Sequence, residues 1–171
     1  MTHDLGILLI RIIVGFGMAA HGAQKLFGWF GGYGPKGTGG FMESLGFRPG
    51  VAFAVMSGGG ELFGGLLILL GLLGPVGPSL VIAVMTVAIL TVHIRHGFFA
   101  ANNGYELPLM YIAGALTAAF TSSSMLTLDN LFGITLFHSA AATWIFVAIG
   151  LVGGILAVLT RHAPAQSSVS A

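Results

Sequence analysis

Cysteine is absent from this 171-residue chain, and charged residues make up only 6% of it. Without cysteine, the chain alone can form no disulfide, no thiolate zinc site and no cysteine-ligated iron–sulfur cluster. Soluble domains carry roughly 25% charged residues, so this chain has too few to cover a surface that faces water. The formal net charge of +1 comes with no basic patch, which argues against a nucleic-acid partner.

Apolar residues dominate instead. They make up 56% of the chain, and its mean hydropathy is +0.97. This composition is typical of integral membrane proteins, so we expect the lipid bilayer to surround the chain. The length and continuity of the apolar segments predict an all-α membrane protein. Five segments qualify as spans: Leu5–Phe27, Val51–Leu73, Val76–Arg95, Leu107–Phe120 and Ile134–Thr160.

The fourth of these segments is shorter than the about 20 residues that a bilayer requires. We expect it either to continue through Ser122–Ser124 or to be partly sheltered by neighbouring spans. The first segment is expected to remain in the protein rather than to be removed as a signal peptide. Met1–Asp4 has no basic region, and Arg11 interrupts the apolar run.

The connections between the spans differ in kind. Residues 28–50 form a long loop rich in glycine and aromatics, with a short amphipathic stretch at Gly40–Gly46. We expect this loop at the rim of the bundle, because its aromatics suit the membrane interface. The sequence GPVGP at 74–78 predicts a tight turn. The polar residues 161–171 predict a disordered tail.

Ionisable side chains inside spans are costly, so each requires a reason. The order of the spans brings a set of them to one half of the bundle: His21, Lys25, Glu61, His93, Arg95, His96 and Glu106. His21 and Lys25 are four residues apart and therefore share a helix face. Arg11 and His138 are expected in the opposite half. We expect Arg11 to reach the headgroups or a structural partner, and His138 to be a hydrogen-bonded helix residue rather than a ligand.

Glu61 is the hardest of these groups to explain by packing alone, because apolar residues and glycines flank it deep in the second span. Its carboxylate must pair with His21, Lys25 or His93, or else remain protonated. Either state suits proton exchange. We therefore predict that Glu61, His21 and His93 share one polar pocket with a functional role.

The other groups also have simpler explanations. Lys25 lies near a helix end and can extend to the headgroups. Arg95 and His96 can be ordinary interface residues. Glu106 can merely favour the N-terminus of the fourth span, beside Pro108. The sequence leaves these alternatives open.

Positive charge is distributed unevenly between the two sides. With five spans, the 28–50 loop, the 96–106 loop and the C-terminal tail lie on one side. That side has Lys25, Lys36, Arg48, Arg95 and Arg161. The other side has only Arg11, inside the first span. The positive-inside rule then places the large loops and the C-terminus in the cytoplasm.

Three stretches, "HGAQKLFGWFGGYGPKGTGGF", "GGGELFGGLLILLG" and "TVHIRHGFFAANNGYELPL", resemble the DoxX family of small bacterial integral membrane proteins. The resemblance runs from about Leu5 to Phe120. It implies a four-helix transmembrane bundle over residues 1–124 and a place in the bacterial inner (plasma) membrane. An additional apolar segment within 125–160, which departs from the family pattern, predicts an extra C-terminal transmembrane helix.

The resemblance also implies redox work in membranes, since relatives include a subunit of thiosulfate:quinone oxidoreductase and form complexes with other redox proteins. This implies a quinone-linked membrane oxidoreductase or a subunit of one, with other membrane or peripheral redox subunits as partners. By matching position, the family's polar motif residues fall on His21, Gln24, Lys25, Glu61, His93, His96, Asn103 and Glu106.

Quinone reduction requires an apolar slot and groups that donate protons to the carbonyl oxygens. We predict His21, Glu61 and His93 as the catalytic proton donors. The predicted substrate-binding residues are Gln24, Lys25, Trp29, Arg95, His96, Phe99, Asn103, Tyr105 and Glu106, with Phe98 beside them at the entrance. Lys25 and Arg95 would attract an anionic electron donor such as a sulfur oxyanion. Electrons would pass directly between substrates, or through a partner or haem.

Three other functions remain open. The chain can be a non-catalytic accessory subunit of a larger respiratory-type membrane complex, with the polar cluster as a structural network or headgroup site. A transporter is less favoured, because the spans are few and show no broken inverted repeat. A haem bundle would use His21 and His93 as axial ligands, and a Soret band in the absorption spectrum would reveal it. No metal site is predicted.

Overall fold

The computed structural model describes residues 2–162, and all regular structure within that range is helical. The long helices are α1 (Thr2–Phe27), α3 (Gly50–Leu70), α4 (Val76–Ala88), α5 (Glu106–Phe120) and α7 (Ala140–Leu159). Two shorter helices are α2 (Gly34–Ser44) and α6 (Leu128–Phe132). Single turns are η1 (Trp29–Gly31), the π-helical η2 (Ile89–His93), η3 (Ile94–His96) and η4 (Ala100–Asn102).

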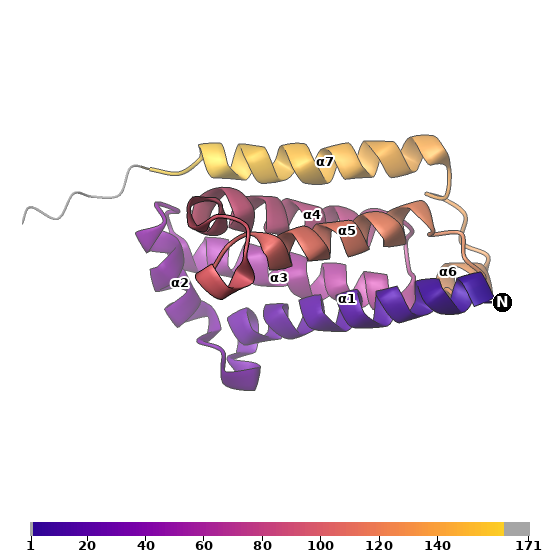
Figure 1. The fold of residues 1–171 in the computed structure, drawn as a ribbon, viewed down its shortest axis with the longest axis horizontal. Helices are drawn as coiled ribbons and strands as arrows, with labels where there is room; N and C mark the ends of the chain where they lie inside the picture. Colours follow the sequence, from indigo (N-terminus) through magenta and orange to yellow (C-terminus); the bar gives the residue numbers. More distant parts are fainter. Residues whose placement is uncertain (1, 163–171) are drawn as a thin grey trace, which may run out of the picture.

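Four helices form a closed ring in which α1 packs on α3, α3 on α4, α4 on α5 and α5 on α1 (Figure 1). Successive members run in opposite directions, as in other up-and-down bundles. Helix α7 lies outside the ring and packs mainly on α4. The predicted all-α bundle with an additional C-terminal helix is therefore confirmed.

Four stretches of the described chain are long and apolar enough to cross a membrane: α1, α3, the continuous stretch Val76–His96 and α7. Helix α5 has only 15 residues and does not extend through Ser122–Ser124, because the chain turns after Phe120. Irregular segments continue from both of its ends, and α1 and α4 pack on its sides. Of the two expectations for this segment, the structure agrees with partial shelter by neighbouring spans, since Ala115, Ala118 and Ala119 are buried whereas Leu107 and Met110 are exposed.

Close approach of α1 and α3 depends on glycine. A Cβ added to Gly22 would lie 2.4 Å from the backbone nitrogen of Leu62, and one added to Gly65 would lie 2.4 Å from that of Ala19. Helices approach this closely in membranes only where small residues meet. The buried core beside this contact includes Met18, Ile68 and residues of α4 and α5.

The 28–50 segment is more regular than its glycine content suggests. The predicted amphipathic stretch at Gly40–Gly46 belongs to the 11-residue helix α2, which has Pro35 in its first turn. Proline is favoured there because its missing N–H has no intrahelical partner in that turn. Met42 and Phe47 pack on Ala54 in a small second core. The segment thus caps one end of the bundle, as expected (Figure 1).

The C-terminal helix begins later than predicted, at Ala140, where the Ser139 side chain accepts a hydrogen bond from the Ala142 N–H. Of the predicted disordered tail at 161–171, the first two residues are ordered against the α2–α3 connection. Arg161 Nε donates to the Leu45 carbonyl at 2.6 Å, and the His162 N–H donates to the Gly46 carbonyl at 2.8 Å. The rest of the predicted tail, 163–171, lies outside the described residues.

The N-terminal end of the bundle is held by two buried charges. Arg11, only 3% exposed, donates to the carbonyls of Ile68, Leu69 and Leu126. Of these acceptors, the Leu69 carbonyl lies in the last turn of α3, where carbonyls lack partners within the helix. Asp129 accepts from two backbone N–H groups of the turn before α4 and contacts His138 Nε2 at 2.9 Å. Arg11 therefore has a structural role, and His138 is hydrogen-bonded as expected but in the loop before α7.

Candidate functional site

A cavity of about 300 Å³ opens among α1, α3, α4 and α5 at the end of the bundle that carries α2. Helices from distant parts of the sequence converge there, together with the loop between η3 and α5. The lining residues are His21, Lys25, Glu61, Met85, Ala88, His93, Ala100, Asn103, Gly104, Leu107, Pro108 and Tyr111. We call this space the polar cavity. It brings together all three predicted catalytic residues, whose catalytic role stays a prediction.

Glu61 is the deepest charged group of the polar cavity and is only 2% exposed. Its Oε1 forms an ion pair with Lys25 Nζ, which also donates to Ser57 Oγ at 3.1 Å. Its Oε2 is buried and has no hydrogen-bond partner among the described residues. A buried acceptor without a partner is costly, so this oxygen is poised to receive a proton or a ligand's donor group.

His93 reaches the polar cavity from a π-helical turn. Such turns add one residue to a helix and often occur at functional sites. Its Nδ1 lies 2.7 Å from the backbone carbonyl of Asn103, an atom that can only accept. Nδ1 therefore carries the hydrogen, and Nε2 is the nitrogen left to exchange a proton. Asn103 adopts the left-handed conformation at φ 62° that closes this loop.

His21 stands at the mouth of the polar cavity with its ring edge-on to Tyr111, at 5.8 Å between centroids and an interplanar angle of 87°. Gln24 orients it. Gln24 Nε2 donates to the Phe30 carbonyl at 3.2 Å, so Gln24 Oε1 faces His21 Nδ1, also at 3.2 Å. The His21 Nδ1–H donates to that oxygen, which again leaves Nε2 for exchange.

Two polar residues of the site were not predicted. Tyr111 reaches over Gly17, where an added Cβ would lie 2.6 Å from the Tyr111 hydroxyl. Ser57 shares the Lys25 ammonium with Glu61. Ser57 precedes Glu61 by four residues. This spacing can be read from the sequence and predicts that both side chains share one helix face. The sequence pointed less clearly to Tyr111, because it is a single tyrosine in a short apolar span.

Most of the other predicted binding residues lie outside the lining of the polar cavity. Asn103 lines it, whereas Trp29, Arg95 and Phe99 are exposed around the same end of the bundle. Tyr105 packs its ring on Phe98, 5.6 Å away between centroids.

Two further predicted binding residues, Glu106 and His96, form hydrogen bonds with the backbone of their own segments. Glu106 Oε2 accepts from the Ala100 N–H at 2.8 Å, which closes the loop before α5. His96 Nδ1 lies 2.8 Å from the Val92 carbonyl and is exposed. The position of Glu106 in the first turn of α5 fits the simpler explanation, favourable charge at a helix N-terminus.

A second hollow, of about 500 Å³, lies between the end of α1, η1 and α2. Gln24, Tyr33 and Thr38 line it, and Lys25 lines both this hollow and the polar cavity. Lys25 is 27% exposed, so it is partly open while it pairs with the buried Glu61. The ammonium thus stands between the aqueous end of the molecule and the carboxylate.

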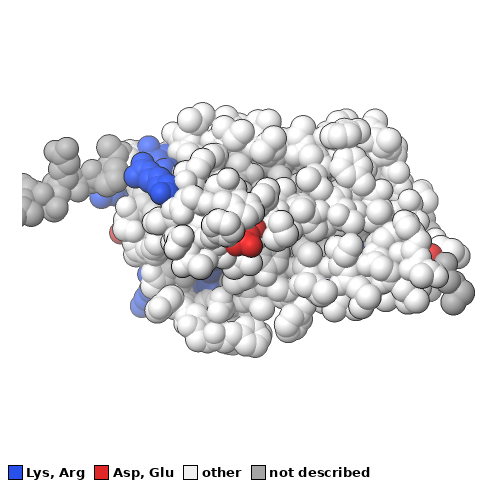
Figure 2. Space-filling model, viewed as in Figure 1, with Lys and Arg blue, Asp and Glu red and all other residues white. Residues whose placement is uncertain are grey.

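Positive charge gathers at this same end. In Figure 2 the Lys and Arg side chains on the visible face lie toward the end that carries α2. Of the six Lys and Arg residues in the sequence, only Arg11 belongs to the other end. Among residues 2–162, no group of three or more His, Asp or Glu side chains is arranged to hold a metal ion.

Comparison with known proteins gives one match. The model of a family described as DoxX matches residues 6–94, more than half of the chain. The match covers α1 to the π-turn that holds His93, and it ends before the loop and the short helix α5. No curated protein and no solved structure matches the chain.

Proposed function

The chain belongs to the DoxX family, and on this premise we propose that it is a quinone-linked membrane oxidoreductase or the membrane subunit of one. Its described part contains four helices able to cross a bilayer, so a lipid-soluble substrate can reach it from the side. The polar cavity would supply the protons. This deepens the family assignment, which by itself specifies only a membrane protein.

One observation carries the proposal. Glu61 is buried beside Lys25 with one carboxylate oxygen unpartnered, at the edge of a cavity that also contains two imidazoles. Reduction of a quinone to its quinol takes up two electrons and two protons. Groups that exchange protons near neutral pH in an apolar setting serve such a step, and histidine and buried carboxylates are the usual ones.

The hydrogen bonds assign a direction to each imidazole. In both His21 and His93, Nδ1 is held by an acceptor oxygen, so Nε2 is the exchangeable position. His21 lies at the mouth and would take protons from water. His93 and Glu61 lie deeper and would hold the protons that the reduced substrate takes up.

The electrons would come from another molecule, not from side chains of this protein. A reduced donor, either a sulfur oxyanion or a partner redox subunit, would deliver two electrons for each quinone. The basic residues around the α2 end favour an anionic donor or an acidic partner surface there.

The test replaces Glu61 by Gln and, separately, His21 by Ala, and measures quinone reduction in membranes together with assembly. Glu43→Gln and His162→Ala are matched controls, because both side chains are exposed and neither lines the polar cavity. We expect turnover to fall at least about tenfold in the first pair, in line with losses of a general acid, and to stay normal in the controls. Normal turnover in Glu61→Gln would overturn the proposal.

A second candidate function rests on α7. This helix lies outside both the four-helix ring and the family match, and its outward side chains, such as Trp144, Leu156 and Leu159, are exposed. That face suits an accessory subunit docked in a larger membrane complex. The same assay separates the two: disrupted assembly with normal turnover in the polar-cavity variants supports the accessory role.

A further inference from the structure

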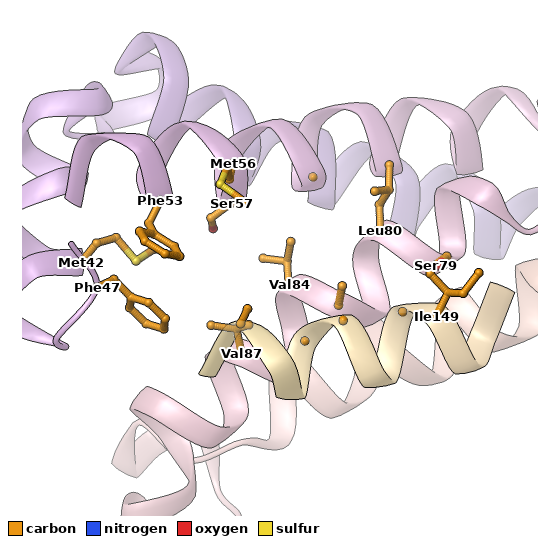
Figure 3. Close-up of a pocket in the computed structure, with 16 residues that line it drawn as sticks. Met42, Phe47, Phe53, Met56, Ser57, Ser79, Leu80, Val84, Val87 and Ile149 are labelled. Carbon is orange, nitrogen blue, oxygen red and sulfur yellow. The ribbon is translucent and has the colours of Figure 1, made fainter. Parts of the chain in front are cut away.

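An apolar groove of about 330 Å³ lies between α3 and α7, with α4 as its floor (Figure 3). Met42 and Phe47 close it at the α2 end. Its walls come from three membrane-spanning stretches, so it faces lipid rather than water. Its size is at the lower end of the about 300–1,000 Å³ typical of small-molecule sites.

The groove and the polar cavity are lined by different faces of α4. Val84 and Val87 face the groove, whereas Met85 and Ala88 face the polar cavity. Ser57 connects the two regions. It lines the groove and points from α3 into it, and it receives the Lys25 ammonium that also pairs with Glu61.

Only two side chains in the groove lining have hydroxyl groups, Ser57 and Ser79. Ser79 Oγ donates to the Phe146 carbonyl at 2.7 Å and is therefore engaged. Ser57 Oγ accepts from Lys25, but within residues 2–162 its O–H donates to no group.

Hydroxyls elsewhere in the bundle behave differently. Thr86, Thr91 and Thr117 each donate to the carbonyl four residues earlier, at 2.7, 2.8 and 3.0 Å. This is the usual arrangement for a hydroxyl in a membrane helix. The Ser57 O–H is therefore a spare donor aimed at an apolar space, which selects an occupant with an acceptor oxygen.

We propose that this groove binds the quinone, its ring and apolar substituents against α4 and α7 and one carbonyl oxygen accepting the Ser57 O–H. The inference rests on the proposed function in taking a quinone as the substrate. A quinone fits because it arrives from the bilayer and presents carbonyl acceptors on an otherwise apolar body. The Lys25–Glu61 pair then lies between a site open to lipid and a cavity open to water.

The test measures the affinity of the purified full chain in lipid nanodiscs for decylubiquinone by titration calorimetry. Gly153→Leu fills the groove lining, because a Cβ at Gly153 has no atom within 4 Å. Gly59→Leu is the matched control, since it is equally unobstructed and does not line the groove. We expect binding to weaken at least about tenfold in Gly153→Leu only.

Ser57→Ala removes the spare donor without filling space. The loss of one hydrogen bond of about 1 kcal/mol predicts an affinity about three- to tenfold weaker, and Ser57→Thr, which keeps the hydroxyl, should restore it. If Gly153→Leu does not fold, this pair decides the question. A quinone bound equally well by Ser57→Ala and Ser57→Thr would overturn the assignment.

The outcomes separate the groove from the proposed function. Undiminished binding in both Gly153→Leu and Ser57→Ala overturns the groove assignment and leaves the function standing if Glu61→Gln still loses turnover. A wild-type chain that binds no decylubiquinone overturns both.

Discussion

Glu61 and Lys25 depend on each other at the scale of single residues. A carboxylate that is 2% exposed is stable only while a cation balances it, and the Lys25 ammonium is the only cation that contacts it among the described residues. Removing one member of a buried pair leaves an uncompensated charge, whereas removing both can be nearly neutral. Function and stability are therefore linked at this pair.

The pair can be tested by a double-mutant cycle. We predict that Lys25→Met lowers the free energy of unfolding by about 3 kcal/mol, because it strands the Glu61 carboxylate. Lys25→Met combined with Glu61→Gln should recover most of that loss. Thermal unfolding in detergent measures both, with the exposed Lys36→Met as the control. Additive effects in the double variant would show that the two side chains do not interact.

Single residues also show which part of the polar cavity could be predicted from the sequence. The grouping of His21, Glu61 and His93 followed from counting spans, since alternate crossings return to the same side. The partners of these residues did not follow. Which carbonyl holds His93 depends on a π-turn and on a left-handed Asn103, and neither leaves a periodic signal in the sequence.

At the scale of elements, apolar length predicted the long helices, and errors arose at their ends. The fifth predicted span began at Ile134, but α7 starts at Ala140 because apolar residues also occur in the loop before it. Helix α2 was predicted only as a stretch at Gly40–Gly46, since its glycines conceal a helix that tertiary packing stabilises. The pattern of apolar residues predicts which segments lie in lipid, but it does not predict the residue at which a helix begins or ends.

Contact between α1 and α3 should depend on its glycines. A Cβ at Gly65 would lie 2.4 Å from the Ala19 nitrogen and 2.5 Å from the Gly15 oxygen, both backbone atoms that cannot move alone. We predict that Gly65→Val destabilises the protein by at least about 2 kcal/mol, as overpacking does. Gly59→Val on the same helix has open space and should be neutral. Equal thermal midpoints for the two variants would contradict this account of the helix contact.

At the scale of the whole molecule, the two ends of the bundle differ in their cavities and in their charge. One end holds Arg11 and Asp129 in buried backbone contacts. The other collects the polar cavity, the hollow beside Lys25 and nearly all of the positive charge. Such an excess of Lys and Arg at one end predicts that this end faces the cytoplasm.

Orientation can be measured without background, because the chain has no native cysteine. Ser44 and Ser123 are exposed at opposite ends of the bundle. In intact cells, a maleimide that cannot cross membranes should label Ser123→Cys and spare Ser44→Cys until the membrane is permeabilised. The reverse labelling pattern would place the polar cavity on the outer side.

If the polar cavity supplies protons to the quinone, the buried Glu61 carboxyl must respond when the quinone binds and is reduced. Infrared difference spectroscopy of the purified chain, with and without decylubiquinone and in both quinone redox states, observes carboxyl groups directly. We predict a change in the carboxyl and carboxylate bands of the wild type that is missing in Glu61→Gln. Identical difference spectra from the two proteins would contradict the account, since the carboxyl at its centre would then take no part.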